Sequence, residues 1–469
     1  MIFNTAYKSW QNCSELRQRR SRYKSYTYGR QWDDIVIDSS TGKAVREGLI
    51  AERSGRKPIT NNLIRQLVKT VVGKYRNMRD EKEVERSEYL SHLYSLNRLD
   101  ELDCRLLEEF LISGCAIQRI SRECRKDGVI ETFVDNVSPN DFFINSIKDP
   151  RGWDTELVGM LRDMSLPEVV MRYAHGDRVR AGEIRRIYGE CFKNYSYETE
   201  FGTNDGGKSS EFFLSPTGRC RIVEVWTLES CEVLRCHDMK SGRYYECPVA
   251  DEKLIAEENE SRIKNAEPEI RTKWSVNTLW RCRIFAPNGV EIDNFLSPYR
   301  HGEHPFVVKL YPMIDGEVHS FVEDVIPQQR HINRLITLID NIMSTSSKGV
   351  LLFPVESKID CIDWESYTRC WASCGGVIPY HSRPGIEPPH QVTSSGLDAG
   401  ASKLLEIQLQ MLQDVSGVNN SLYGGNMTGI VGAERYEKQV ENATVALTDI
   451  LETFKDLLRV RDEKAEASV

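Results

Sequence analysis

PQQRHINRLITLIDNIM, residues 327–343, predicts a long helix opened by a proline. Apolar residues recur every three or four positions, which is the spacing of one helix face. They are Ile332, Leu335, Ile336, Ile339, Ile342 and Met343. The opposite face has almost no net charge, whereas a helix against solvent usually carries more. Its residues are Asn333, Arg334, Thr337, Asp340, Asn341 and Ser344. The pattern indicates a helix that faces neither plain solvent nor a plain apolar core.

Downstream of this helix, the sequence predicts a small module, a second helix, a loop and a third, long helix. The module, about residues 348–395, is dense in Gly, Pro and Trp. The second helix aligns Leu404, Ile407, Met411 and Val415 on one side. Two helices that flank one module form a stalk with a head. Neither helix carries enough charge to be fully exposed to solvent, and neither has an apolar surface wide enough to be fully buried. Packing against copies of the same chain would satisfy both helices.

The last helix begins near Ala433, and its apolar residues alternate in steps of four and three. They are Tyr436, Val440, Ala443, Leu447, Ile450, Phe454 and Leu457. Such a narrow stripe suits packing along another helix. An ordinary amphipathic helix on its own domain fits equally well, so both interpretations stay open.

The part before the stalk predicts an α+β unit with mostly antiparallel strands. Helices are expected at residues 14–28, 63–79, about 86–112 and about 251–266, and SLPEVVMRYA opens with a capping box. CAIQRISRE and VIETFVDNV, joined by Lys-Asp-Gly, predict a hairpin. Further strands are expected at RIVEVWTL, EVLRCHDM, YYECPV, LWRCRIFA and EIDNFL, and a loop at 202–217.

Composition and charge narrow the class of protein. No run of about eighteen apolar residues predicts a membrane span, and the first residues lack the apolar block of a signal peptide. Thirteen cysteines among 469 residues are then expected to be reduced thiols inside a cell. The net charge of −8 divides into +11 for residues 1–79 and −19 for the rest. The basic segment RQRRSRYK could touch phosphate, or it could be a solvated helix face.

Two kinds of enzyme site were weighed and disfavoured. Gly424 and Gly429 have the spacing of a phosphate-binding loop, but Ile430 and Val431 follow where Lys and Ser/Thr are needed. Cysteines and histidines gather at Cys220, Cys231, Cys236, His237 and Cys247, and again at Cys370, Cys374, His381 and His390. Their spacing is too loose for a zinc site, so buried thiols are the better interpretation. We therefore expect no catalysis, no metal and no cofactor.

In the sequence of several stretches and in their order along the chain, most of the protein resembles the portal proteins of tailed bacteriophages, particularly the short-tailed kind. The matching stretches are YGRQWDD, RKPITNNLIRQLVKTVVGKYR, VSPNDFFINSIKDP, RIVEVWTL, SPYRHGEHPFVVKLYP, GEVHSFVEDVIPQQRHINRLITLIDNIM and VSGVNNSLYGG. In that family, subunits form a ring, typically of twelve copies, around a DNA channel at one capsid vertex. The resemblance implies partners: further copies of the chain, double-stranded DNA, the large terminase, the major capsid protein and a tail adaptor, with no membrane. It also implies assembly in the bacterial cytoplasm and residence in the virion.

The resemblance also implies a division of the chain. This is a wing at 1–320, a first stem helix at 321–347, a clip at 348–395, a second stem helix at 396–416, a tunnel loop at 417–428, and a helix at 429–469 that returns to the wing. The sequence ends at RVRDEKAEASV, so a crown is expected to be minimal, missing or removed.

Candidate site residues follow from these positions. The channel loop offers Asn419, Asn420, Ser421, Asn426 and Thr428; the stem interface Ile332, Leu335, Ile336, Ile339 and Ile342; and the clip docking surface Trp364, Tyr367, Trp371 and Tyr380. For any single one of these clip aromatics, a place in that module's core is the favoured interpretation. Two alternatives remain: another virion structural or adaptor protein without DNA passage, and a metal-dependent nuclease.

Overall fold

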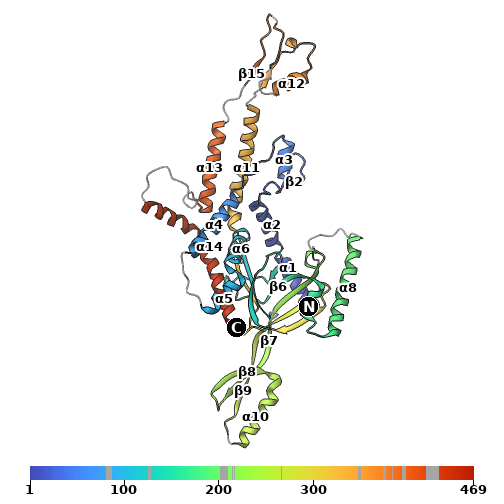
Figure 1. The fold of residues 1–469 in the computed structure, drawn as a ribbon, viewed down its shortest axis with the longest axis vertical. Helices are drawn as coiled ribbons and strands as arrows, with labels where there is room; N and C mark the ends of the chain where they lie inside the picture. Colours follow the sequence, from blue (N-terminus) through green and yellow to red (C-terminus); the bar gives the residue numbers. More distant parts are fainter. Residues whose placement is uncertain are drawn as a thin grey trace.

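The computed structural model describes residues 1–80, 87–124, 128–200, 210–213, 215, 217–265, 267–346, 350–372, 377–382, 384–392, 398–418 and 433–468. The molecule is elongated (Figure 1). A small head module, within residues 350–392, stands at one end on a stalk of two helices, α11 and α13. A body of helices and sheet lies in the middle. An arm made of β8, α10 and the outer parts of β7 and β9 projects from the other end.

Helices and strands together confirm the α+β class. The helices are α1 Ile2–Asn12, α2 Ser14–Thr27, α3 Glu47–Arg53, α4 Leu63–Asp80, α5 Glu88–Asn97, α6 Leu99–Ser113, α7 Leu166–Tyr173, α8 Arg178–Glu200, α9 Ser210–Phe213, α10 Glu252–Lys264, α11 Phe321–Ser346, α12 Trp364–Ala372, α13 Asp398–Ser416 and α14 Ala433–Ala467, with short 3-10 turns at Val249–Asp251 and Val355–Ser357. The strands are β1 Ile35–Ile37, β2 Ala44–Arg46, β3 Cys115–Cys124, β4 Ile130–Asn136, β5 Phe142–Ile144, β6 Leu157–Met164, β7 Cys220–Asp238, β8 Arg243–Pro248, β9 Ile270–Phe285, β10 Glu291–Leu296, β11 Phe306–Leu310, β12 Pro312–Ile314, β13 Glu317–Val318, β14 Val350–Leu352 and β15 His390–Val392.

The body contains two antiparallel sheets. The larger has the order β10-β9-β7-β6-β5, with β8 paired to β7, and the smaller has the order β11-β3-β4. The β3–β4 hairpin is the one that the sequence predicts. The two strands expected at RIVEVWTL and EVLRCHDM are instead one continuous strand of 19 residues, β7. No Gly or Pro interrupts residues 228–231, so the strand continues out of the body and, with β9, forms the stem of the arm (Figure 1).

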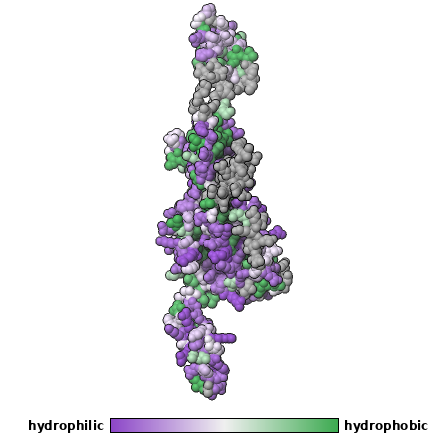
Figure 2. Space-filling view, turned by 90° about the vertical axis from the view of Figure 1, so that its left-hand side faces the viewer, coloured by the Kyte–Doolittle hydropathy of each residue, from purple (hydrophilic) through white to green (hydrophobic). Residues whose placement is uncertain are grey.

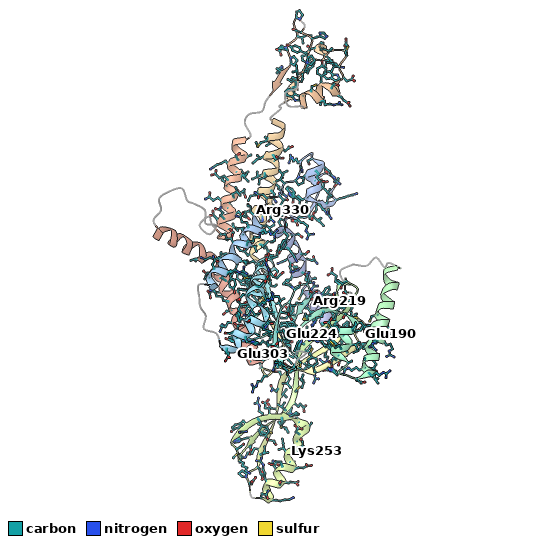
Figure 3. All side chains as sticks on the ribbon, in the orientation of Figure 1. Glu190, Arg219, Glu224, Lys253, Glu303 and Arg330 are labelled. Carbon is teal, nitrogen blue, oxygen red and sulfur yellow. The ribbon has the colours of Figure 1, made fainter. Side chains whose placement is uncertain are left out.

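A buried ion pair joins the two sheets. Glu224 of β7 accepts hydrogen bonds from Arg119 of β3 at 3.2 Å and from Trp226 Nε1 at 2.9 Å. Burial is the largest single influence and favours the neutral acid, but the positive charges of Arg119 and Arg162 and the hydrogen bonds from Trp226 and Arg119 together lower the pKa of Glu224. Figure 3 shows Glu224 in the centre of the body. Removing either partner would leave a buried charge uncompensated.

The sequence predicts a single helix at residues 86–112. This prediction is wrong in one respect, because the segment forms two helices, α5 and α6. Arg98 has a left-handed backbone with φ 51°. The side chain of Asn97 also bonds to β4: its Oδ1 accepts the Val134 N–H at 3.1 Å. The chain therefore turns at 97–98, and Leu93 and Leu106 reach the same core. The predicted capping box at Ser165 and Glu168 is present in α7.

Candidate functional site

The sequence predicts that this stalk helix begins at its proline, but α11 begins before the proline. Ser320 caps the helix: its hydroxyl accepts the Glu323 N–H at 3.0 Å. Pro327 therefore lies inside α11 rather than at its start. The ring of Pro327 is on the exposed side of the helix, and the helix loses one backbone hydrogen bond there.

The uncharged polar face of α11 is buried against the N-terminal part of the same chain. Gln329, Asn333 and Thr337, each four residues apart, are almost fully buried. They accept alternate backbone N–H groups of segment 59–63: Ile59 to Thr337 Oγ1 (3.1 Å), Asn61 to Asn333 Oδ1 (3.1 Å) and Leu63 to Gln329 Oε1 (3.0 Å). Four helical residues rise about 6 Å, close to the roughly 6.6 Å between alternate residues of an extended chain. We call this set of bonds the polar ladder.

A second set of contacts fixes the same face. Glu47 at the start of α3 accepts hydrogen bonds from Arg330 at 2.7 Å and from Arg334 at 2.6 Å. Burial is the largest single influence and acts against the charged guanidinium, but the hydrogen bond to Glu47 and the nearby charges of Glu47, Tyr26 and Asp34 together raise the pKa of Arg330. Figure 3 shows Arg330 where α11 passes the N-terminal elements. Gln329, Arg330, Asn333, Arg334 and Thr337 of α11 thus all have partners in the N-terminal part of the same chain, although Arg330 Nε and Gln328 Oε1 are buried without a hydrogen bond.

The apolar face of α11 divides into a covered part and an open part. Ile332 is buried in the large helical core of the body, and Leu335 is buried but does not belong to that core. The chain itself covers both side chains, which argues against the predicted contact of these two residues with a neighbouring subunit. Ile336 is partly buried and packs against the helical core, whereas Ile339 and Ile342 are partly buried outside it. These three residues remain candidates for an interface.

The second stalk helix, α13, packs beside α11. Leu405 and Leu409 lie against the helical core, and Leu412 is buried in it. A different set on the flank of α13 is exposed, with relative accessibilities of 43% for Leu404, 39% for Ile407, 48% for Met411 and 48% for Val415. We call these four the α13 stripe. Figure 2 shows apolar side chains gathered at this level on the face that presents α13.

The residues of the α13 stripe are not among the candidate interface residues, although the sequence predicts that both stalk helices pack against copies of the chain. The sequence does show these residues in line. Periodicity alone predicts that a helix has an apolar face, but it does not say which faces the chain itself covers. In α13, the side that the chain covers carries Leu405, Leu409 and Leu412. The aligned residues of the α13 stripe therefore remain exposed.

The head module separates its aromatic residues into core and surface. Tyr367 is buried; its hydroxyl donates to the Pro379 carbonyl at 3.1 Å and accepts the Ile359 N–H at 3.2 Å. Tyr367 is therefore a core residue, and its place in a docking surface is wrong. Trp364 and Tyr380 are exposed, and Trp371 is half-buried.

The predicted channel-loop residues Asn419, Asn420, Ser421, Asn426 and Thr428 lie outside the described residues. So do the side chains of the first part of α14. In its described part, Leu447, Ile450, Phe454 and Leu457 pack in the helical core of the body. That part of α14 is therefore an amphipathic helix on its own domain.

The basic N-terminal segment is partly engaged inside the subunit. Arg20 donates two hydrogen bonds to Glu109, and Arg17 lies over the ring of Trp10 at 3.7 Å. These two arginines therefore do not lie on a solvated helix face, and they are not free to contact phosphate. On α4, by contrast, Arg65, Lys69 and Arg76 are exposed, as the sequence predicts.

The thiols of the arm lie close together without forming a larger group. Cys236 and Cys247 have sulfur atoms 3.3 Å apart, whereas Cys220 is at the other end of β7. Within the described ranges, no three His, Cys, Asp or Glu side chains converge in a way that could hold a metal ion. The same ranges contain no helix long and apolar enough to cross a bilayer.

Comparison with known proteins identifies one family. The model of a family described as Phage P22-like portal protein matches residues 87–460, well over half of the chain. The match includes both stalk helices, the head module and most of the body. Among curated proteins, no sequence matches the chain significantly.

Proposed function

The chain belongs to the P22-like phage portal protein family, and from this premise we propose how its parts assemble and act. Proteins of this family are structural, and they form the portal at the capsid vertex through which DNA is packaged. We propose a closed ring, expected to contain about twelve copies, in which the body is the wing, the stalk is the stem and the head module is the clip.

The observation that carries this proposal is the α13 stripe. Four apolar side chains in line on one exposed helix flank are costly to leave in water. Contiguous exposed apolar residues mark interaction surfaces. A neighbouring subunit beside α13 would cover them, and a repeated side-by-side contact of this kind generates a ring when its rotation closes.

The clip is proposed as the docking surface for the terminase and the tail adaptor. Trp364 and Tyr380 are exposed on the head module, which lies at one end of the molecule (Figure 1). Trp and Tyr are frequent anchors of protein interfaces. The wing would contact the major capsid protein, and assembly would take place in the bacterial cytoplasm.

The channel loop at 417–428 is proposed from composition. GVNNSLYGGNMT contains no Lys or Arg and no Asp or Glu. Each Lys or Arg contact to phosphate adds affinity and salt dependence, so a neutral loop would let DNA slide in both directions. Its Asn, Ser and Thr side chains offer weak hydrogen bonds that exchange easily.

Electron microscopy of the purified protein tests the proposal. The expected image is a closed ring with a central channel wide enough for duplex DNA. A ring-shaped particle without such a channel would favour a virion structural protein that does not pass DNA. A stable monomer would overturn the ring.

A further inference from the structure

The N-terminal hairpin β1–β2 presents an apolar face that its own subunit does not cover. Ile35 and Ile37, two residues apart on β1, have relative accessibilities of 72% and 77%. Alternate residues of a strand share a face. Their cross-strand partners Arg46 and Ala44 lie on that same face. An isoleucine pair this open on a folded subunit indicates a contact surface.

The hairpin is held in place although one face is open. An isolated two-stranded hairpin is marginally stable at best, so its attachment to the rest of the chain matters. Trp32, just before β1, donates its Nε1–H to the Ile59 carbonyl at 3.1 Å. Glu47, just after β2, is bonded to Arg330 and Arg334 of α11. The polar ladder fixes segment 59–63 on the same helix, so the hairpin is presented from the stalk in a defined position.

The hairpin and the α13 stripe lie on opposite sides of α11. Figure 1 shows α13 on one side of that helix and β2 with α3 on the other, at about the same height along the molecule. The two apolar patches therefore cannot cover each other within one subunit. Subunits standing side by side around an axis would bring the hairpin of one copy to α13 of the next.

We propose that the Ile35–Ile37 face of each subunit packs on the α13 stripe of the adjacent subunit. The partner is a second copy of this chain, and this inference rests on the ring proposed above. Each copy would give its hairpin to one neighbour and receive a hairpin from the other, which is a head-to-tail contact suited to ring closure. Charged residues lie beside both patches: Arg46 is exposed on the hairpin face, with its guanidinium 3.8 Å from Asp33, and Asp414 is exposed between Met411 and Val415. Arg46 and Asp414 have opposite charges, which suits a contact between the two patches.

Cysteine cross-linking within purified rings tests this contact. In the double variant Ile37→Cys/Ile407→Cys, mild oxidation with diamide should link neighbouring subunits. A denaturing gel without reductant should then show a ladder of dimers, trimers and higher species. Each single variant should match the native chain, which controls for the exposed native thiols Cys124, Cys361 and Cys370. Ile130→Cys/Ile407→Cys is the matched control, because Ile130 is also an exposed isoleucine of a strand, but its strand, β4, belongs to the body.

A second variant tests the energetics of the same surface. Ile35→Asp/Ile37→Asp should leave the subunit folded, since both side chains are already in water, but should lower the fraction of protein in rings at least tenfold. Val179→Asp, another exposed apolar position, should leave that fraction unchanged. Intact rings that give no ladder with Ile37→Cys/Ile407→Cys or with Ile35→Cys/Val415→Cys would overturn the hairpin contact and leave the ring standing. A native protein that forms no ring at all would overturn both proposals.

Discussion

The two stalk helices have opposite relations to the chain that carries them. On α11, a polar face is buried and every described member of the ladder is bonded to segment 59–63. On α13, an apolar flank is exposed. A buried polar group is tolerated when it is hydrogen-bonded, and an exposed apolar row is explained when a partner covers it. Polarity alone therefore does not tell which helix face belongs to the subunit and which to the assembly.

The difference assigns separate tasks to the two helices. The contacts of α11 fix the N-terminal hairpin and segment 59–63 to the stalk, so damage to them should appear as lost stability of the single subunit. The outer flank of α13 makes no contribution to the subunit core, so damage to it should appear in the ring alone. The predictions below test this separation, beginning with the largest expected effect.

Leu335→Asp should destabilise the subunit most. Leu335 is buried within the subunit, so the variant places a carboxylate in a buried environment, at a cost of about 3–5 kcal/mol. The melting temperature of dissociated subunits should fall clearly. Met343→Asp, on the same helix at an exposed position, should leave it unchanged. A Leu335→Asp subunit that melts like the native one would show that this residue is not part of the subunit core.

Asn333→Leu should have the next largest effect, because it breaks the polar ladder. The Asn61 N–H would lose its acceptor and Gln31 would lose the donor Nδ2 of Asn333. Each buried group left without a partner costs about 1–3 kcal/mol. Urea unfolding of the subunit should show the loss, whereas Gln410→Leu on the exposed side of α13 should not. Equal unfolding midpoints for the two variants would remove the distinction between the helices.

Acid should weaken the subunit through His304, a contact of the body that does not depend on the ring. Burial, Lys464 and His301 lower the pKa of His304 well below its usual value, and its Nδ1 accepts the Phe306 N–H; Glu303 is the nearby carboxylate. Below about pH 6.5 the unfolded chain binds a proton that the folded chain does not, so stability falls by about 1.4 kcal/mol per pH unit.

The matched variant is His304→Asn, whose side-chain oxygen can accept an N–H two residues on but does not titrate. Its stability should fall less between pH 7 and pH 5.5 than that of the native subunit, measured by thermal melting. An identical pH profile in both proteins would place the proton uptake elsewhere.

Lys69→Glu/Arg76→Glu should have the smallest effect. Both side chains are exposed, and the acidic remainder of the chain offers partners on neighbouring subunits. Ring formation should weaken in low salt and recover at high salt, because exposed charges separated by more than about 10 Å are screened at 0.1 M. Sedimentation at two salt concentrations would measure it, and a salt-independent change would argue against electrostatic contact between subunits.

The long helices and strands of this fold can be predicted well from the sequence. The predictions fail where contacts between segments far apart in the chain determine the structure. The helix at residues 63–79 and the capping box of α7 can be predicted from the sequence, because both depend on neighbours within one helix. The break at Arg98 was missed, because the bonds between Asn97 and β4 join segments far apart in the chain. The polar face of α11 was recognised as unusual, but its partner, segment 59–63, lies more than 260 residues away in the chain.

The candidate site shows the same limit. The order of first stalk helix, head module and second stalk helix can be predicted from the sequence. The portal family can be identified because several stretches of the chain resemble that family in the same order. The candidate interface residues include Ile332 and Leu335, which the chain itself covers, and do not include the α13 stripe. Periodicity shows an apolar face on α11 and one on α13, but it does not show which face the chain's own body covers.

The central claim, that the α13 stripe assembles subunits without stabilising them, is tested most directly by the particle mass of Ile407→Asp measured beside the native protein. The native protein should have the mass of a closed ring, near twelve subunits. Ile407→Asp should be found as single subunits that melt at the temperature of dissociated native subunits, because a carboxylate is tolerated where Ile407 meets water and not where a neighbour covers it. Rings of native mass and stability from Ile407→Asp would contradict the claim.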